Sequence, residues 1–430
     1  MIGTDNKDQQ QGRVETAYLV GCKSANNSVD NSKEHLDELK ELVNTMGLKT
    51  VGTEIANVRL PNSRYYIGSG KVEEITDAAK RFDADCIIVD FELSPSQQRN
   101  WEKLSNLCVI DRQEVILDIF ADRATTREAV IQVALARMEY SLPRLKRAWT
   151  HLSRQRGGNK GTRGEGEKQL EADRRLVQNR ITQLKKDLKE VSKHREVQRA
   201  KREKQSTPIA AIIGYTNVGK SSLLNALSGA NAFVENKLFA TLDPTTRIVN
   251  FPNNQNLLVT DTVGLIRKLP HNLVEAFKST LEAALVADFI IHVLDISNPS
   301  VEDHWKTTLK LLDELNALDK PSIIVFNKMD KLESPVVKAR MNALYKNSVF
   351  ISVKTGEGID TLKSKLIEQI NKDSDLMQLC IPVDKHDISS KVYRVGKVIN
   401  AKYEDNNTLI YARIPKKYQS NFQEYSTRNR

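Results

Sequence analysis

Short apolar runs alternate with amphipathic stretches in the first part of the chain. The runs at 16–20, 86–89 and 108–110 predict strands, because each is brief and rich in apolar residues. Apolar residues recur at helical spacing over 34–46, which ends at a candidate capping glycine, and over 71–82. Ser94 followed by Pro95 is a typical helix start. Residues 1–125 are therefore predicted to form a small α/β domain on a parallel sheet.

Seven-residue apolar periodicity replaces this alternation over residues 126–206. The first seam comprises Ile131, Leu135, Met138, Leu142 and Leu145, and the second comprises Leu170, Val177, Ile181, Leu184, Leu188 and Val191. Two such helices predict an antiparallel helical hairpin. Strands followed by helical patterns return over 207–373, which predicts a mixed sheet flanked by helices. Residues 374–430 predict a small α+β module with strands at 392–398 and 408–414.

The segment that joins the two hairpin helices, 154–167, holds five glycines and four basic residues. The basic residues are Arg154, Arg156, Lys160 and Arg163. Glycine allows close backbone approach to a ligand, and Arg and Lys pair with phosphates. The tip is thus a candidate RNA-binding loop, and the alternative is a merely flexible connection.

Charge is unevenly distributed along the 430 residues, whose net charge is +10. Residues 144–204 carry 20 Lys+Arg against 8 Asp+Glu, whereas the rest carries 45 against 47. An excess of this size in one segment indicates a polyanionic partner. Cys22, Cys86, Cys108 and Cys380 lack metal-ligand spacing, so we expect free thiols. The polar N-terminus and the lack of an apolar run of about 20 residues predict neither a signal peptide nor a membrane span.

A glycine-rich phosphate-binding motif follows the strand at 209–213. Gly214-Tyr-Thr-Asn-Val-Gly-Lys-Ser221 fits G-x-x-x-x-G-K-S between a strand and a helix, which is its required context. Backbone N–H groups of such a loop surround phosphates, Lys220 reaches the β- and γ-phosphates, and Ser221 ligates Mg²⁺. Gly68-Ser-Gly-Lys71 is too short for such a loop and predicts a turn before a helix.

Two further motifs predict nucleotide-sensing switches. Phe239-Ala-Thr-Leu-Asp-Pro-Thr-Thr-Arg247 offers Thr241 to Mg²⁺, because the other threonines lie beyond Pro244. Asp261-Thr-Val-Gly264 follows an apolar strand, so Asp261 can hold Mg²⁺ through water and the Gly264 amide can sense the γ-phosphate. Lys220, Thr241 and Gly264 are the predicted catalytic residues.

Two last motifs predict guanine selectivity. Asn327-Lys-Met-Asp330 places a carboxylate where it can accept hydrogen bonds from N1 and N2 of guanine, which adenine lacks. Ser352-Val-Lys354 supports the base. The predicted GTP-binding residues are Gly214, Tyr215, Thr216, Asn217, Val218, Gly219, Lys220, Ser221, Ser222, Phe239, Ala240, Thr241, Leu242, Asp243, Asp261, Thr262, Val263, Gly264, Asn327, Lys328, Met329, Asp330, Ser352, Val353 and Lys354.

Leu265 occupies the position where many GTPases carry a water-orienting glutamine. We therefore expect slow intrinsic hydrolysis that is stimulated by another part of the chain, a bound cation or a partner. Asn217 is a candidate K⁺ ligand, and a loop-stabilising asparagine is the equal alternative.

Together these motifs resemble the HflX family of GTPases, related to the Obg group. The resemblance covers residues 14–373 and includes Glu92-Leu-Ser-Pro-Ser-Gln-Gln-Arg-Asn-Trp101, Tyr140-Ser-Leu-Pro-Arg-Leu145 and Gly161-Thr-Arg-Gly-Glu-Gly-Glu167. It implies an α/β N-terminal domain, a helical linker and a GTPase domain. It also implies binding to the large ribosomal subunit and its RNA, and splitting or rescue of stalled ribosomes.

Two alternatives remain at this point: a GTPase of large-subunit assembly, and a nucleotide-sensing scaffold with protein partners. We expect a cytoplasmic monomer that can associate peripherally with membranes, binding GTP, GDP and Mg²⁺. The role of residues 374–430 does not follow from the resemblance.

Overall fold

The computed structural model describes residues 14–24, 31–145, 163–203, 207–230, 238–252, 255–267, 283–332, 334–372, 374–404 and 406–427, with the backbone alone at 163–170, 192–203 and 417. Its contacts divide the chain into two compact units. The first comprises Met1–Leu188, Lys237–Phe239 and Leu269–Ala276, and the second comprises Lys189–Asn236, Ala240–Lys268 and Phe277–Arg430. Each unit has helices and at least one sheet of its own, which confirms the predicted α/β multidomain class.

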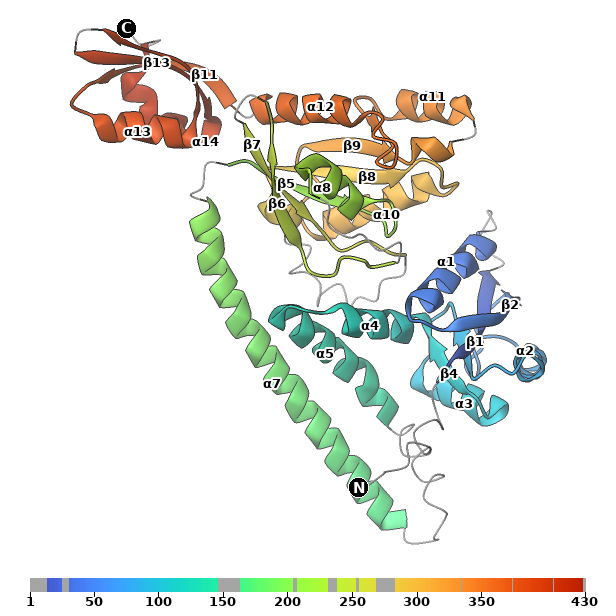
Figure 1. Ribbon diagram of the computed structural model, residues 1–430. Helices are drawn as coiled ribbons and strands as arrows, with labels where there is room; N and C mark the ends of the chain where they lie inside the picture. The colour runs from blue at the N-terminus through green and yellow to red at the C-terminus, as the bar shows by residue number, and fades with distance from the viewer. Residues whose placement is uncertain are drawn as a thin grey trace, which may run out of the picture. The chain divides into compact units, whose positions relative to one another are not determined.

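A four-stranded parallel sheet forms the centre of the first unit (Figure 1). Its strands are β1 Thr16–Ser24, β2 Lys49–Val58, β3 Cys86–Val89 and β4 Cys108–Asp111, in the order β2-β1-β3-β4. The helices around it are α1 Ser32–Thr45, α2 Ser69–Arg81, α3 Pro95–Ser105 and α4 Arg112–Arg123. Ser94 caps α3 by accepting a hydrogen bond from the Gln97 N–H (3.2 Å), and Gly68 precedes α2 as a turn. These elements confirm the predicted strands and the three predicted helices.

Two elements of this unit escape the sequence pattern. β2 is an edge strand whose residues are mostly exposed or half-buried, so it lacks the apolar run that marks β3. α4 begins directly after β4, because Asp111 ends the strand and also caps the helix through the Glu114 N–H (3.0 Å). Because no polar loop separates β4 from α4, the sequence pattern does not show where the strand ends and the helix begins.

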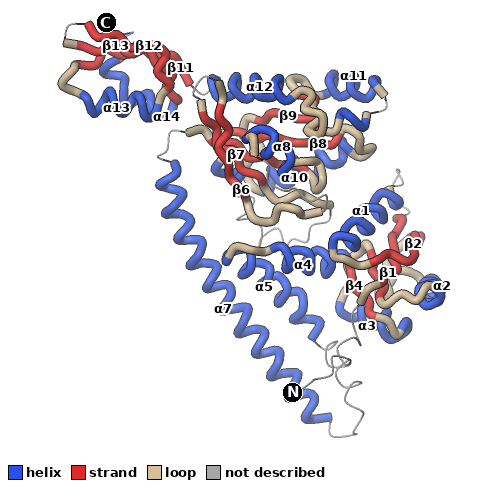
Figure 2. Tube along the Cα trace, viewed as in Figure 1, coloured by secondary structure: helices blue, strands red, loops and turns tan. Residues whose placement is uncertain are grey.

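The helical hairpin joins the first unit through α5 Arg127–Ser141, the short turn η1 Leu142–Arg144 and α7 Arg163–Glu203. Figure 2 shows α5 beside α4. Ile181 and Leu184 of the predicted second seam are buried, and Lys185 of α7 pairs with Glu139 of α5 at 2.8 Å. Within the first unit, α7 therefore lies against α5 as the apolar seams predict.

The second unit contains a six-stranded sheet in the order β10-β9-β8-β5-β7-β6. Its strands are β5 Ile209–Gly214, β6 Thr245–Asn250, β7 Asn256–Asp261, β8 Phe289–Asp295, β9 Ser322–Asn327 and β10 Val349–Phe350. Only β6 runs antiparallel to its neighbour. The helices are α8 Lys220–Ser228, α10 Val301–Glu314, α11 Pro335–Leu344 and α12 Ile359–Lys372, with the short turn η2 Met329–Lys331. Because β5, β7, β8 and β9 are parallel, the residues that follow them gather at one edge.

The chain ends in a three-stranded antiparallel sheet, with α13 and α14 along one side of it (Figure 1). The elements are β11 Ser374–Pro382, α13 His386–Val395, β12 Lys397–Glu404, β13 Asn407–Pro415, α14 Lys416–Gln419 and η3 Ser420–Tyr425. The predicted strand at 408–414 is confirmed, whereas the one predicted at 392–398 begins at Lys397, so its first part is wrong. Val392 and Val395 belong to α13, where they pack with Ile388 on one helical face.

No helix among the described residues is long and apolar enough to cross a membrane.

Candidate nucleotide-binding site

The phosphate-binding loop runs from the buried strand β5 to α8. Gly219 caps α8 in the left-handed conformation (φ 94°), and a side chain there would come within 2.5 Å of the Asn327 amide nitrogen. Gly264 of the third motif lies against the loop, since a Cβ would lie 2.9 Å from Thr216 Cα and 3.0 Å from Lys220 Nζ. Neither position has room for a side chain. Because Gly264 of the third motif lies against Thr216 and Lys220 of the loop, the first and third motifs form one surface.

Lys220 is the buried cation of this loop. Its ammonium donates a hydrogen bond to the Tyr215 carbonyl (2.7 Å), and only 6% of the residue is exposed. Burial lowers the pKa of Lys220 to about 8, with Asp261 opposing the shift. A charged group held in so apolar a setting is poised to be stabilised by phosphate oxygens.

The three predicted metal ligands meet at one point. Ser221 Oγ donates to Asp261 Oδ2 (2.6 Å), Thr241 Oγ1 donates to the same oxygen (2.9 Å), and the two hydroxyls are 2.8 Å apart. Asp261 is 1% exposed, and its Oδ1 has no hydrogen-bond partner among the described residues. Burial raises the pKa of Asp261, while Lys220 lowers it. A set of hard oxygens with one orphaned acceptor fits Mg²⁺.

The fourth and fifth motifs lie together at the ends of β9 and β10. Asn327 donates through Nδ2 to the Val218 carbonyl (2.8 Å) and accepts at Oδ1 from the Val353 N–H (3.1 Å). Ser352 donates to Asp330 Oδ1 (2.7 Å), and this bond holds the pKa of Asp330 below its usual value. Asp330 thus presents an ionised carboxylate, and Asn327 ties the base site to the phosphate loop.

Comparisons with known proteins match this chain over most of its length. Three family models match in sequence: "GTP-binding GTPase N-terminal" at 33–121, "GTP-binding GTPase Middle Region" at 123–202 and "50S ribosome-binding GTPase" at 209–328. The GTPase HflX of Akkermansia muciniphila is 44% identical over 413 residues, 94% of either chain. That of Escherichia coli K12 is 39% identical over 389 residues, 90% of this chain and 91% of the relative.

The chain belongs to the HflX family of GTPases. It is therefore a P-loop GTP hydrolase that binds GTP and GDP, and its family generally uses Mg²⁺ with the nucleotide. A crystal structure described as "SsGBP and GDP complex" matches 83% of this chain and 98% of its own, at 25% identity and a TM-score of 0.48.

Several of the predicted GTP-binding residues of this HflX-family chain make contacts within the protein itself. Thr262 is fully buried and donates to the Ile212 carbonyl (2.7 Å). Within the first unit, the Phe239 ring packs edge-on against Phe120, with centroids 4.5 Å apart. Asn217 is exposed and left-handed (φ 59°), a conformation that asparagine tolerates. The nucleotide contacts of these residues, and a K⁺ ligand at Asn217, stay predictions.

Tyr215 of the phosphate loop makes further contacts that the sequence did not indicate. Tyr215 stacks on His304 of α10 (centroids 3.7 Å apart), and its hydroxyl accepts a hydrogen bond from the Arg267 N–H (2.7 Å). Leu265 lies between these elements and is 4% exposed; its N–H donates to the Gly214 carbonyl (3.1 Å). The segment after the third motif is thereby joined to the phosphate loop through backbone atoms. In the sequence, the aromatic residue Tyr215 within the phosphate loop was the one sign of this link.

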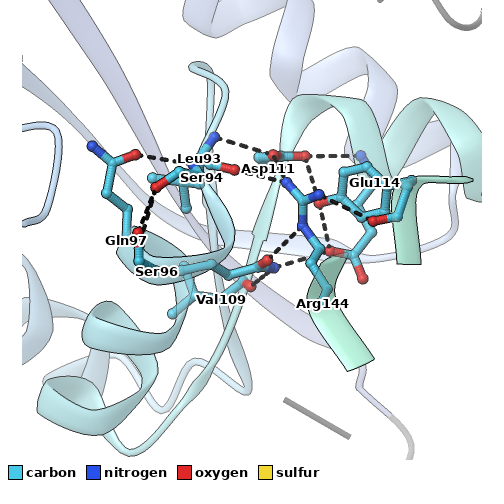
Figure 3. A network of polar contacts seen from close by, with 10 residues as sticks. Leu93, Ser94, Ser96, Gln97, Val109, Asp111, Glu114 and Arg144 are labelled. Atoms are coloured by element: carbon cyan, nitrogen blue, oxygen red, sulfur yellow. Dashed lines mark hydrogen bonds and ion pairs between the residues drawn. The ribbon is translucent and has the colours of Figure 1, made fainter. Parts of the chain in front are cut away.

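Arg144 organises a second polar network, in the first unit (Figure 3). Its guanidinium donates to the Leu93 carbonyl (2.7 Å) and to Gln98 Oε1 (3.0 Å), and lies 3.7 Å from Asp111 Oδ2. It also stacks 3.6 Å over the Tyr140 ring, and the Tyr140 hydroxyl donates to Asp111 Oδ1 (3.1 Å). The motif at 140–145 therefore fixes the end of α5 to the N-terminal sheet. From the sequence, residues 140–145 were noted only as part of the family resemblance, with no structural role.

Of the predicted RNA-binding residues, Arg154, Arg156 and Lys160 lie outside the described residues, and Arg163 is described by its backbone alone, at the start of α7.

Proposed function

We propose that this GTPase binds the large ribosomal subunit through its RNA and splits or rescues stalled or idle ribosomes. Two findings support the choice of partner. Residues 144–204 carry 20 basic against 8 acidic residues, which suits an RNA backbone. The GTPase part of the chain also matches a family model described as a 50S ribosome-binding GTPase.

The observation that carries the switch is the cluster of Ser221, Thr241 and Asp261. It joins the phosphate loop, the second motif and the third motif through hydrogen bonds of 2.6 to 2.9 Å. Filling this cluster with Mg²⁺ would neutralise phosphate charge and stabilise the transition state of hydrolysis. Thr241 would ligate Mg²⁺ only while the γ-phosphate is present, so hydrolysis would free its segment from the metal.

The residues of the site predict slow unassisted hydrolysis. Lys220 would stabilise the charge on the β- and γ-phosphates, and the Gly264 N–H would donate to the γ-phosphate. Leu265 is apolar and buried, so it cannot orient the attacking water. We therefore propose that the ribosome supplies the missing group and stimulates hydrolysis.

Sedimentation of intact ribosomes on a density gradient tests this function. Ribosomes are incubated with the protein and GTP, a non-hydrolysable analogue or GDP. We expect GTP and the analogue to convert ribosomes into subunits, with the protein on the large one. Ribosomes that stay intact in every nucleotide state would exclude splitting, and protein on immature large subunits would then favour assembly.

Two variants separate the parts of the proposal. Thr241→Ala removes the switch hydroxyl, so it should retain subunit binding but split ribosomes equally poorly with GTP and GDP. Replacement of the four tip residues Arg154, Arg156, Lys160 and Arg163 by alanine should abolish ribosome binding while GTP binding is unchanged. Ribosome binding that survives this change would contradict the role of the tip and leave the scaffold hypothesis.

A further inference from the structure

A cavity of about 480 Å³ lies within the second unit, away from the nucleotide site. One wall comes from the residues that begin β5, β7 and β8, among them Gln255 and Asp288. The other wall comes from α13, β12 and β13, among them Tyr393, Lys397 and Arg413. Because the phosphate loop follows the carboxyl end of β5, a strand of six residues separates the two sites by about 20 Å. The cavity is therefore no part of the GTP site.

The C-terminal wall of the cavity is strongly basic. It contains Arg394, Lys397, Arg413 and Lys416, and Asp288 is the one carboxylate that lines the cavity. Lys397 and Arg413 are direct cross-strand neighbours, so their like charges repel. Among the described residues, neither of them forms an ion pair. An anion bound between them would relieve this repulsion, which points to phosphate as part of the ligand.

The opposite wall presents acceptors rather than cations. Gln255 is 9% exposed, and its Nε2 donates to Asn371 Oδ1 (3.0 Å), whereas its buried Oε1 has no partner among the described residues. Asp288 Oδ2 accepts the Ile209 N–H (2.8 Å), which fixes its carboxylate at the start of β5. Thr207 and Asn256 also line this wall, and its one charged group is the carboxylate of Asp288, which repels free phosphate. A ligand that combines phosphate with N–H or O–H donors fits both walls.

We infer that the cavity binds a nucleotide unit of a single-stranded RNA segment. Its phosphates would lie between Lys397 and Arg413, and its ribose hydroxyl or base N–H would donate to Asp288. Tyr393, a residue that is 54% exposed, offers an aromatic face on which the base can stack. The volume lies within the range of sites for small organic groups. The inference rests on the proposed function, because ribosomal RNA is the RNA that the protein would meet.

This cavity gives residues 374–430 a role. RNA held between the two walls would touch both the GTPase sheet and the C-terminal module, at the edge opposite to GTP. The protein would then contact RNA at two separate places, the tip of the hairpin and this cavity.

Fluorescence anisotropy with a labelled single-stranded RNA and the full chain tests the inference. The wild-type chain, whose tip is intact, is the reference for RNA affinity. Lys397→Glu with Arg413→Glu should lower that affinity at least about 10-fold, since two phosphate contacts are lost. The salt dependence of log K should also fall by about 1.4, the value for two phosphate contacts on a single strand.

Lys391→Glu with Lys402→Glu is the matched control. These two residues lie in α13 and β12 of the same module, do not line the cavity and give the same change of charge. We expect the control to lower the affinity by about 2-fold or less, the effect of general electrostatics. Equal losses in both pairs would overturn the inference. Thermal unfolding of each variant, with GTP binding as a second check, separates loss of contact from loss of fold.

Asp288→Asn and a competing nucleotide identify the ligand. Asp288→Asn should reduce the preference for RNA over the same sequence of DNA, because the amide oxygen keeps the Ile209 N–H and an NH₂ group replaces the acceptor of a ribose hydroxyl. A mononucleotide that displaces the RNA at equal concentration would show a site for free nucleotides and overturn the RNA assignment. If the cavity binds RNA but the protein does not sediment with large subunits, the proposed function fails and the cavity assignment stands.

Discussion

In each of the two large sheets, a buried aspartate stands at the carboxyl end of a strand that pairs in parallel with its neighbour, but the two carboxylates differ in their surroundings. Asp111 ends β4 in the first unit, and Asp261 ends β7 in the second. Both are at most 1% exposed, and burial raises the pKa of both carboxyls. The carboxyl edge of a parallel sheet is where ligands bind. What differs is how the protein itself satisfies each carboxylate.

Asp111 is saturated by its own chain. Both oxygens accept hydrogen bonds, from the Leu93 N–H, the Glu114 N–H and the Tyr140 hydroxyl, and Arg144 lies beside them. Asp261 accepts two hydroxyls on one oxygen and leaves the other without a described partner. A saturated carboxylate stabilises a fold, whereas an incompletely satisfied one is available to a ligand. The comparison teaches that unmet hydrogen bonding marks the functional edge better than burial does.

The largest expected effect concerns the base site of the second sheet. Asp330→Asn should weaken GTP binding about 10⁴-fold, because an amide meets the guanine N1–H with a donor. Xanthosine triphosphate, whose base carries an acceptor there, should bind the variant better than GTP does. Isothermal titration with both nucleotides measures this. Unchanged GTP affinity would show that Asp330 does not contact the base.

Asp261→Ala tests the functional half of the comparison. The rate of GTP hydrolysis should fall about 10²–10³-fold, since a charged group near the phosphates is lost. The free energy of unfolding should change little, because loss of a buried carboxylate with one unmet oxygen offsets loss of its two hydroxyl donors and of the charge beside Lys220. Phosphate release and urea unfolding are the two measurements. A large loss of stability with normal hydrolysis would reverse the assignment.

Arg144→Ala tests the structural half. Removing the guanidinium leaves Asp111 buried without its cation, so the first unit should lose about 3 kcal/mol of unfolding free energy. GTP hydrolysis should be unaffected in the isolated protein. Arg137→Ala is the control, because its pair with Asp118 (2.7 Å) is half-exposed and should contribute less than about 1 kcal/mol. Similar losses in both variants would show that burial of the network is unimportant.

A smaller effect is expected from His292, a buried residue of β8 that stacks on Trp305 (centroids 4.4 Å apart). Burial lowers the pKa of His292 to about 3. Between pH 6.5 and 3, His292 is protonated in the unfolded chain but neutral in the folded protein. The free energy of unfolding therefore falls as the pH falls. The loss at pH 5 should be about 2 kcal/mol.

His292→Phe keeps an aromatic ring beside Trp305 and removes the titration. Urea unfolding of wild type and variant at pH 7 and pH 5 gives the difference, which cancels the contribution of the carboxylates. A variant with the same pH dependence as the wild type would contradict the assignment.

The nucleotide site was largely predictable because its chemistry is local. A strand, a glycine loop and a helix are consecutive in sequence, so the spacing from Gly214 to Ser221 is sufficient to identify the phosphate loop. The helices and short strands of the N-terminal sheet were likewise visible in local periodicity. β2 was missed because an edge strand has no continuous apolar run, and residues 392–395 were misassigned because β-branched residues also suit a buried helical face.

Long-range contacts could not be read from the sequence. Arg144 and Asp111 are 33 positions apart, and no local pattern predicts that a guanidinium will stack on Tyr140 and reach the Leu93 carbonyl. The cavity beside β12 is a similar case, since Gln255 and Arg413 meet there only through the fold.

The sequence by itself determined the family and the order of the nucleotide motifs, and it predicted the residues around GTP and the basic hairpin. Each of these depends on residues within one short segment, where spacing and side-chain chemistry suffice. Only the tertiary structure decided that Ser221, Thr241 and Asp261 share one oxygen, and that Asp111 is saturated while Asp261 is not. Such facts depend on which distant segments meet, and packing of the whole unit sets that, because a buried polar group must find its partner wherever the fold brings one.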